Sequence, residues 1–179
     1  KVKDSIITME NNKLIIDFNT MGGQISSVRL KEFETYKNYA KNDKNIEPLI
    51  FFNKGDASNG LILPMIDGSN LNTVDEIFNV KYFDNSTIVF ELRKGEKQSI
   101  EFSYELKPNK YNLDYSITLN GFEDKLKSND ILFNWSASLR KTERSLSEQR
   151  RVSTICFKYK EEGFDWLNEM SDGDLDSED

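Results

Sequence analysis

The strongest constraint on the fold is a series of alternating apolar and polar residues between residues 86 and 139. This period of two is typical of strands with one buried and one solvated face. The apolar positions fall into four runs: Ile88, Phe90 and Leu92; Ile100, Phe102, Tyr104 and Leu106; Tyr111, Leu113, Tyr115, Ile117 and Leu119; and Ile131, Phe133, Trp135, Ala137 and Leu139.

The links between the first three runs, Arg93–Lys97 and Lys107–Lys110, have the length of hairpin turns. The pattern therefore predicts an antiparallel meander within an all-β sandwich of two antiparallel sheets. Its expected core residues share one parity along the strands: Ile100, Phe102, Tyr104, Leu113, Tyr115, Ile117, Phe133 and Trp135. If Trp135 is buried, its replacement by alanine should strongly lower the melting temperature.

A second hairpin is predicted over Lys13–Leu30, where two apolar runs flank Gly22 and Gly23. Glycine takes the positive φ of a tight reversal without a Cβ clash. In the second run, Ile25 falls on the face opposite Val28 and Leu30. A β-bulge, or a strand that changes sheets, would explain this break.

The remaining segments predict one or two short helices, in Lys31–Asn45 and Lys141–Gln149, and a strand at Val152–Tyr159. Phe164–Leu167 is an apolar cluster that we expect to pack onto the domain. With 179 residues, the chain is long enough for one core. We therefore expect a single β-sandwich domain over residues 1–167, followed by an acidic linker at residues 168–179.

The charge of the chain argues against two classes of partner. The formal net charge is −7, whereas binding to nucleic acid requires a basic face that neutralises phosphates. The same charge argues against a polybasic contact with anionic lipid. No run is long enough to span a membrane, so we expect no direct insertion of this segment into lipid.

The residues also argue against catalysis. The chain contains no histidine, which is the commonest general base and metal ligand. The single cysteine, Cys156, lies within a predicted strand, where a small core residue is the simpler interpretation than a nucleophile. Carboxylates are abundant, but no spacing singles out a pair. We therefore expect no enzyme activity, no cofactor and no metal site.

One basic cluster stands out, and it is formed by Arg140, Lys141, Arg144, Arg150 and Arg151, interrupted by Glu143 and Glu148. A solvated loop is the simplest interpretation of such a cluster. The alternative is a docking surface for an acidic partner. If a partner binds here, the candidate residues are Arg140, Arg144, Arg150 and Arg151.

Several short motifs follow one another along nearly the whole chain. They are Asp17–Ile25, Val28–Leu30, Glu47–Phe52, the strand, turn, tyrosine and strand of Leu106–Ile117, and then Phe157–Lys160 and Phe164–Asp165. Each motif alone is ordinary. In this order, the set resembles the large periplasmic domain of the YidC-type membrane protein insertases.

The resemblance implies a β-supersandwich similar to galactose mutarotases, with the acidic linker leading toward the membrane core of a multi-pass protein. It implies a non-catalytic accessory module on the periplasmic face of the bacterial inner membrane. The implied partners are auxiliary subunits of the Sec translocon and, through the full-length insertase, nascent membrane proteins. Nothing in the chain matches the membrane core that carries insertion, so no groove residue can be assigned.

Two other functions stay open at this point. A carbohydrate-binding domain is one, because aromatic residues on a sandwich face can stack on sugar rings. Mutarotase catalysis itself would require histidines, which the chain lacks. An adhesion-type β-sandwich of an envelope protein is the other.

Overall fold

A computed structural model describes residues 4–41, 47–128, 131–158 and 163–168. The chain divides into two compact units. The first unit comprises residues 1–33 and 47–140, and the second comprises residues 34–46 and 141–179. The prediction of one domain over residues 1–167 stays a prediction. The predicted acidic linker lies outside the described residues, except at Asn168.

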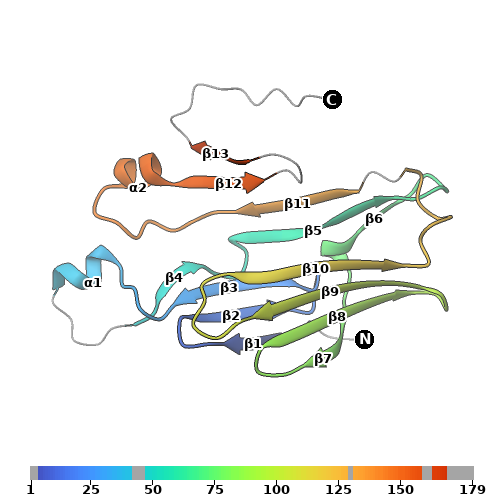
Figure 1. Cartoon of the computed structure of the whole chain (residues 1–179), viewed down its shortest axis with the longest axis horizontal. Helices are drawn as coiled ribbons and strands as arrows, with labels where there is room; N and C mark the ends of the chain where they lie inside the picture. The colour runs from blue at the N-terminus through green and yellow to red at the C-terminus, as the bar shows by residue number, and fades with distance from the viewer. Residues whose placement is uncertain (1–3, 42–46, 129–130, 159–162, 169–179) are drawn as a thin grey trace. The chain divides into compact units, whose positions relative to one another are not determined.

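The first sheet of the first unit has the antiparallel order β1-β2-β3-β4 (Figure 1). Its strands are β1 (Ile6–Glu10), β2 (Leu14–Asn19), β3 (Gln24–Leu30) and β4 (Leu49–Phe52). The predicted β2–β3 hairpin is confirmed, with φ of +80° at Gly22 and +57° at Gly23. The predicted irregularity is a bulge, because Asp17 pairs with Ser27 while Phe18 pairs with Ile25, which leaves Ser26 as an extra residue.

The second sheet has the order β10-β9-β8-β7 and contains most of the predicted meander. Its strands are β7 (Asn79–Phe83), β8 (Thr87–Lys94), β9 (Gln98–Leu106) and β10 (Leu113–Asn120). The sequence did not predict β7. A register shift between Val80 and Tyr82 breaks the alternation by which a strand is recognised.

A third sheet corrects the predicted meander. The fourth run forms β11 (Leu132–Ala137), which leaves the meander and pairs with β5 (Ala57–Pro64). On its other side, β5 pairs with β6 (Asn70–Asn72), which precedes the 3₁₀ turn η1 (Thr73–Asp75). No local sequence pattern predicts this pairing, because β5 and β11 lie far apart along the chain.

Apolar side chains from the first two sheets form one continuous core. Phe18 of β2 is fully buried, and its ring lies 4.9 Å from that of Tyr104 on β9 and 6.1 Å from that of Phe90 on β8. The third sheet contributes Leu61 and Leu63 from β5 to the same cluster. The all-β, antiparallel sandwich predicted from the sequence is confirmed.

Two stacked tyrosines join the core to the edge strand β10, Tyr104 being buried and Tyr115 partly buried. The rings of Tyr104 and Tyr115 are 4.6 Å apart and nearly parallel. The Tyr104 hydroxyl donates a hydrogen bond of 2.9 Å to the Gly23 carbonyl oxygen, which ties β9 to the β2–β3 turn. Burial raises the pKa of Tyr104 to about 12 and also raises the pKa of Tyr115. Both hydroxyls therefore stay protonated at neutral pH, as suits a structural role.

The predicted core is only partly correct. Ile100, Phe102 and Tyr104 are buried, and Leu113 and Tyr115 are partly buried against the core. Ile117, Phe133 and Trp135 are exposed, and Trp135 is exposed by 72%. The parity was read correctly, but β10 and β11 are edge strands of their sheets. Since Trp135 is exposed, the predicted destabilisation by Trp135→Ala is not expected.

A hydrogen-bonded carboxylate organises the turn between β7 and β8. Asp84 accepts hydrogen bonds from the Tyr82 hydroxyl at 2.6 Å and from the backbone N–H groups of Ser86 and Thr87. These bonds lower the pKa of Asp84 from 3.8 to about 2, with the Tyr82 bond as the largest cause. Because the folded pKa is depressed, this stabilisation is present above the ordinary pKa and is lost as the pH falls through about 2.

The second unit contains α1 (Tyr36–Lys41), α2 (Leu146–Val152) and the hairpin of β12 (Thr154–Lys158) and β13 (Phe164–Asn168). The two short helices agree with the prediction. Two predictions are wrong: Cys156 is exposed rather than a core residue, and Phe164 of the apolar cluster is exposed by 76%. An isolated two-stranded hairpin has too few neighbours to bury both faces. Among the described residues, no helix has the length and hydropathy needed to cross a membrane.

Candidate functional site: a partner-binding surface

Arg140 lies just after β11, in the first unit, and forms an ion pair within that unit. Its Nε donates a hydrogen bond of 3.1 Å to Oδ2 of Asp56, which precedes β5. Two hydrogen bonds lower the pKa of Asp56. The larger effect comes from the backbone N–H of Asn53, and the next from the Arg140 guanidinium. Arg140 therefore fastens the end of β11 to the start of β5, and Asp56 offsets part of its charge.

The other three candidate arginines lie in the second unit. The Arg144 guanidinium lies over the ring of Tyr36, 6.0 Å from its centroid. Arg151 lies on α2 and pairs with Glu148 at 2.9 Å. Arg150 lies on the same helix and is exposed.

Local hydrogen bonds hold the segment that carries these arginines. The Ser145 hydroxyl caps α2 by accepting a hydrogen bond from the Glu148 N–H at 3.3 Å. The side-chain oxygen of Gln149 accepts hydrogen bonds from the N–H groups of Thr142 and Glu143. The carbonyl oxygen of Thr142 in turn accepts a hydrogen bond from the Tyr36 N–H at 2.8 Å, so α1 and α2 are linked.

The basic cluster is therefore divided between the two units. Arg140 belongs to the first unit, and Arg144, Arg150 and Arg151 belong to the second. Arg140 and Arg151 have acidic partners within their own units. The local positive charge is consequently weaker than the sequence alone indicates, because Asp56 and Glu148 each offset one arginine.

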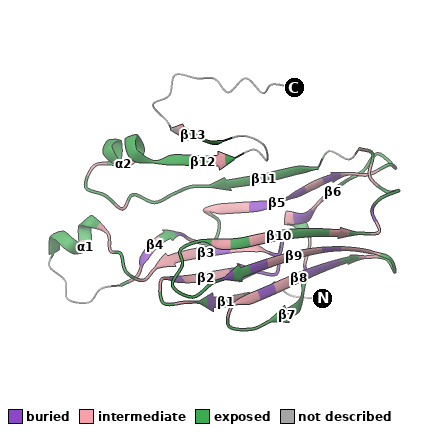
Figure 2. Cartoon of the chain, viewed as in Figure 1, coloured by how far each residue is buried: buried purple, intermediate pink, exposed green. Residues whose placement is uncertain are grey.

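The most exposed apolar feature of the first unit is β11, which the sequence analysis had assigned to the core. All of its residues are exposed (Figure 2), including Leu132 at 55%, Phe133 at 41% and Trp135 at 72%. A series of large apolar side chains on a monomeric surface often marks an interaction site. The alternation of apolar residues in this strand was visible in the sequence, but a buried strand and an uncovered edge strand can show the same alternation.

A shallow pocket of about 400 Å³ lies on the sheet that contains β11. Its walls include Ser58, Gly60 and Ile62 of β5 and Asn134, Trp135 and Ser136 of β11. The 3₁₀ turn η1 packs directly against Gly60 and supplies another wall of the pocket, Val74. A Cβ at Gly60 would lie only 2.7 Å from the side chains of Thr73 and Val74, so a larger residue there would displace η1.

The described residues contain no group of three or more histidine, cysteine, aspartate or glutamate side chains that could hold a metal ion. Burial raises the pKa values of Tyr104, which lies in the core, and of Tyr115, which is partly buried against it. The described surface does carry an apolar edge strand, a pocket beside it, and arginines. These features suit binding of a partner.

The comparisons with known proteins agree with the resemblance found in the motifs. The chain is 27% identical over 97% of its length to a membrane protein insertase YidC from Phocaeicola vulgatus. It is 29% identical over 96% of its length to the YidC of Bacteroides fragilis, and 28% over 90% to that of Parabacteroides distasonis. It covers only 27%, 27% and 25% of these three relatives, respectively.

Two further comparisons add little. No protein-family model matches the chain. Among solved structures, a galactose mutarotase related enzyme from Lactobacillus acidophilus aligns with 64% of this chain and 43% of its own, at 15% identity and a TM-score of 0.41. This likeness is too distant to bear on function.

The similarity to the insertases is collinear and spans both units, because the aligned segments cover nearly the whole chain. The chain accordingly resembles, over 90% or more of its length, one segment of YidC-type membrane protein insertases.

Proposed function

We propose that this chain is a non-catalytic accessory module of a membrane protein insertase, on the periplasmic face of the bacterial inner membrane. The observation that carries the proposal is the similarity to relatives named membrane protein insertase over almost the entire chain. The whole relatives are about four times longer than the aligned segment, as their 27% coverage implies. The insertion activity would belong to the remainder of such a protein.

Charge and surface chemistry suggest how the module would act. The formal net charge of −7 discourages broad contact with anionic lipid. The segment Tyr111–Arg151 combines exposed apolar strands with the basic cluster, so an acidic partner could be steered toward it. We propose that this segment docks weakly onto an auxiliary periplasmic subunit of the Sec translocon. Tethering by the membrane part would raise the effective concentration and make weak contacts sufficient.

The test is charge reversal of the four arginines in the full-length protein: Arg140→Glu, Arg144→Glu, Arg150→Glu and Arg151→Glu together. We expect crosslinking to the auxiliary Sec subunits in membranes to be lost, because attraction to an acidic surface becomes repulsion. A matched control reverses Lys37, Lys54, Lys94 and Lys97, which lie outside the Tyr111–Arg151 segment. It changes the net charge equally, and it also breaks two ion pairs, at Lys54 and Lys94.

The control variant should crosslink like the unchanged protein. Equal circular dichroism spectra and melting temperatures of the two variant domains would establish that both remain folded. If the arginine variant is folded and still crosslinks normally, the docking site lies elsewhere and this part of the proposal is wrong.

A further inference from the structure

Among the described edge strands of the first unit, β11 is the one without the usual protection against edge pairing. Exposed edges present unpaired backbone groups, and proteins shield them with charge, bulges or short strands. β1, β7 and β10 carry Glu10, Lys81 and Asp114 respectively, and β7 also has a bulge. β4 and β6 have only four and three residues.

By contrast, β11 is six residues long, Leu-Phe-Asn-Trp-Ser-Ala, without a charged residue or proline. It pairs with β5 in continuous register from Leu132 to Ala137, so its backbone is regular. In the sheet order β11-β5-β6 it is the outer strand. Within the first unit, the other side of β11 pairs with no described strand, so it offers the backbone pattern onto which another extended chain can add.

The side chains on both faces of β11 suit an apolar occupant. On one face, Phe133 contacts the ring of Tyr115 at 6.0 Å, so this face continues the core outward to the exposed Trp135. On the other face lie the small side chains of Asn134 and Ser136, beside the pocket above Gly60. A long side chain of an added strand could reach over these small residues, as diagonal neighbours in a sheet do.

We propose that β11 binds an extended, uncharged segment of a nascent membrane protein by strand addition. Pairing with the backbone of β11 requires the bound segment to be extended. Because β11 has no charged residue, a charge on the bound segment would be buried without a partner, which is costly, so we expect β11 to prefer uncharged segments. A second copy of this chain is a poorer occupant, because two copies that each carry a net charge of −7 repel one another. Only the source of the segment rests on the proposed function.

The probe for this proposal is a fluorescein-labelled ten-residue peptide of alternating valine and threonine, titrated with the 179-residue chain and followed by fluorescence anisotropy. We expect Trp135→Lys to weaken binding about tenfold or more, because it removes a large apolar contact and places a charge on the edge. Asn134→Lys, on the other face of the strand, should weaken binding as well. The matched control is Phe83→Lys, an aromatic exposed by 48% on the edge strand β7, which should leave binding unchanged.

Two further measurements distinguish strand addition from non-specific hydrophobic binding of the peptide. The same peptide with an N-methyl group on every residue has no N–H to donate along either edge, so it cannot pair with β11 and should not bind. The chain has two tryptophans, Trp135 and Trp166, so Trp166→Phe leaves Trp135 as the sole reporter. Its emission should shift to shorter wavelength when the peptide covers it.

The proposal is overturned if the N-methylated peptide binds equally, or if folded Trp135→Lys binds like the unchanged chain. It is also overturned if sedimentation shows that β11 pairs with a second copy, as a dimer abolished by Trp135→Lys. The fourfold arginine variant should bind the peptide normally. Both proposals together predict that this variant loses Sec crosslinking and keeps peptide binding. Retained crosslinking by the folded variant would mean that the Sec-docking proposal fails, whereas absence of peptide binding by the unchanged chain would mean that the strand-addition proposal fails.

Discussion

Replacement of Phe18 by alanine should lower the free energy of unfolding by about 3–5 kcal/mol, the usual cost of removing a large buried aromatic side chain. Phe18 is fully buried on β2, and its ring packs against Phe90 and Tyr104 of the opposing sheet. The alanine variant leaves a cavity between the two sheets that the surrounding rings cannot fill. Urea denaturation followed by far-UV circular dichroism measures the change.

Trp135→Ala is the matched control for this prediction, because it also removes a large aromatic ring. Trp135 is exposed by 72%, so its loss should change the free energy of unfolding by no more than about 0.5 kcal/mol, as at other surface positions. Equal destabilisation by the two variants would mean that Trp135, and not only Phe18, is a core residue, and the described packing would be wrong.

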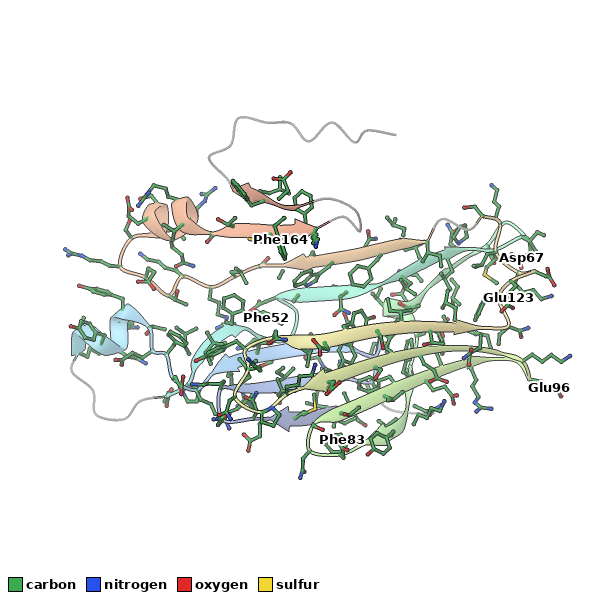
Figure 3. All side chains as sticks on the ribbon, in the orientation of Figure 1. Phe52, Asp67, Phe83, Glu96, Glu123 and Phe164 are labelled. Atoms are coloured by element: carbon green, nitrogen blue, oxygen red, sulfur yellow. The ribbon has the colours of Figure 1, made fainter. Side chains whose placement is uncertain are left out.

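Gly121→Ala should destabilise the fold by about 2–4 kcal/mol, the sum of a left-handed backbone penalty and a steric clash. Gly121 follows β10 and has φ of +70°. A Cβ there would overlap the carbonyl oxygen of Lys97 in the β8–β9 turn. The turns marked by Glu96 and Glu123 lie at the same end of the sheet (Figure 3), so the clash would push two turns apart.

Gly55→Ala and Gly68→Ala isolate the backbone penalty. These glycines also have positive φ, +90° and +86° respectively, but an added Cβ would meet no atom within 4 Å. In the same urea experiment they should lose only about 1–2 kcal/mol, the cost of the left-handed conformation. If Gly121→Ala is no worse than these two variants, then the approach of Lys97 to Gly121 is not as close as described.

Local patterns predicted the strands well because each depends on neighbours in the sequence. Gly22 and Gly23 have the positive φ values that a tight reversal requires and that glycine permits. The bulge in β3 follows from the changed parity of Ile25 relative to Val28. The alternation of β9 predicted its buried residues Ile100, Phe102 and Tyr104 correctly, because β9 is an interior strand of its sheet.

The errors arise where a strand's environment depends on distant parts of the chain. Phe133 and Trp135 have the parity of core residues, but their burial depends on what lies beyond β11, and β11 is the outer strand of its sheet. Cys156 lies in a strand as predicted, yet β12 pairs only with β13, so neither face is well covered. Periodicity specifies which face a residue points to, but not whether anything covers that face.

The candidate binding residues illustrate the same limit. The sequence identified the arginines because charge is visible in it, but the pairing of Arg140 with Asp56 joins residues 84 positions apart. The pocket above Gly60 depends on η1 passing over β5. Neither feature has a local signature. The alternation of apolar residues in β11 was visible in the sequence. It predicted a core strand because alternation alone does not show whether another element covers the apolar face.

The central claim, that the chain is a non-catalytic accessory module of an insertase, is tested most directly by reconstitution. The full-length protein is placed in liposomes with and without residues 4–168, and insertion of a small single-span membrane protein is measured by protease protection. We predict that both forms insert the test protein to a similar extent, because the proposal assigns the insertion activity to the remainder of the full-length protein. Loss of insertion when only these residues are removed from an otherwise folded protein would contradict the claim.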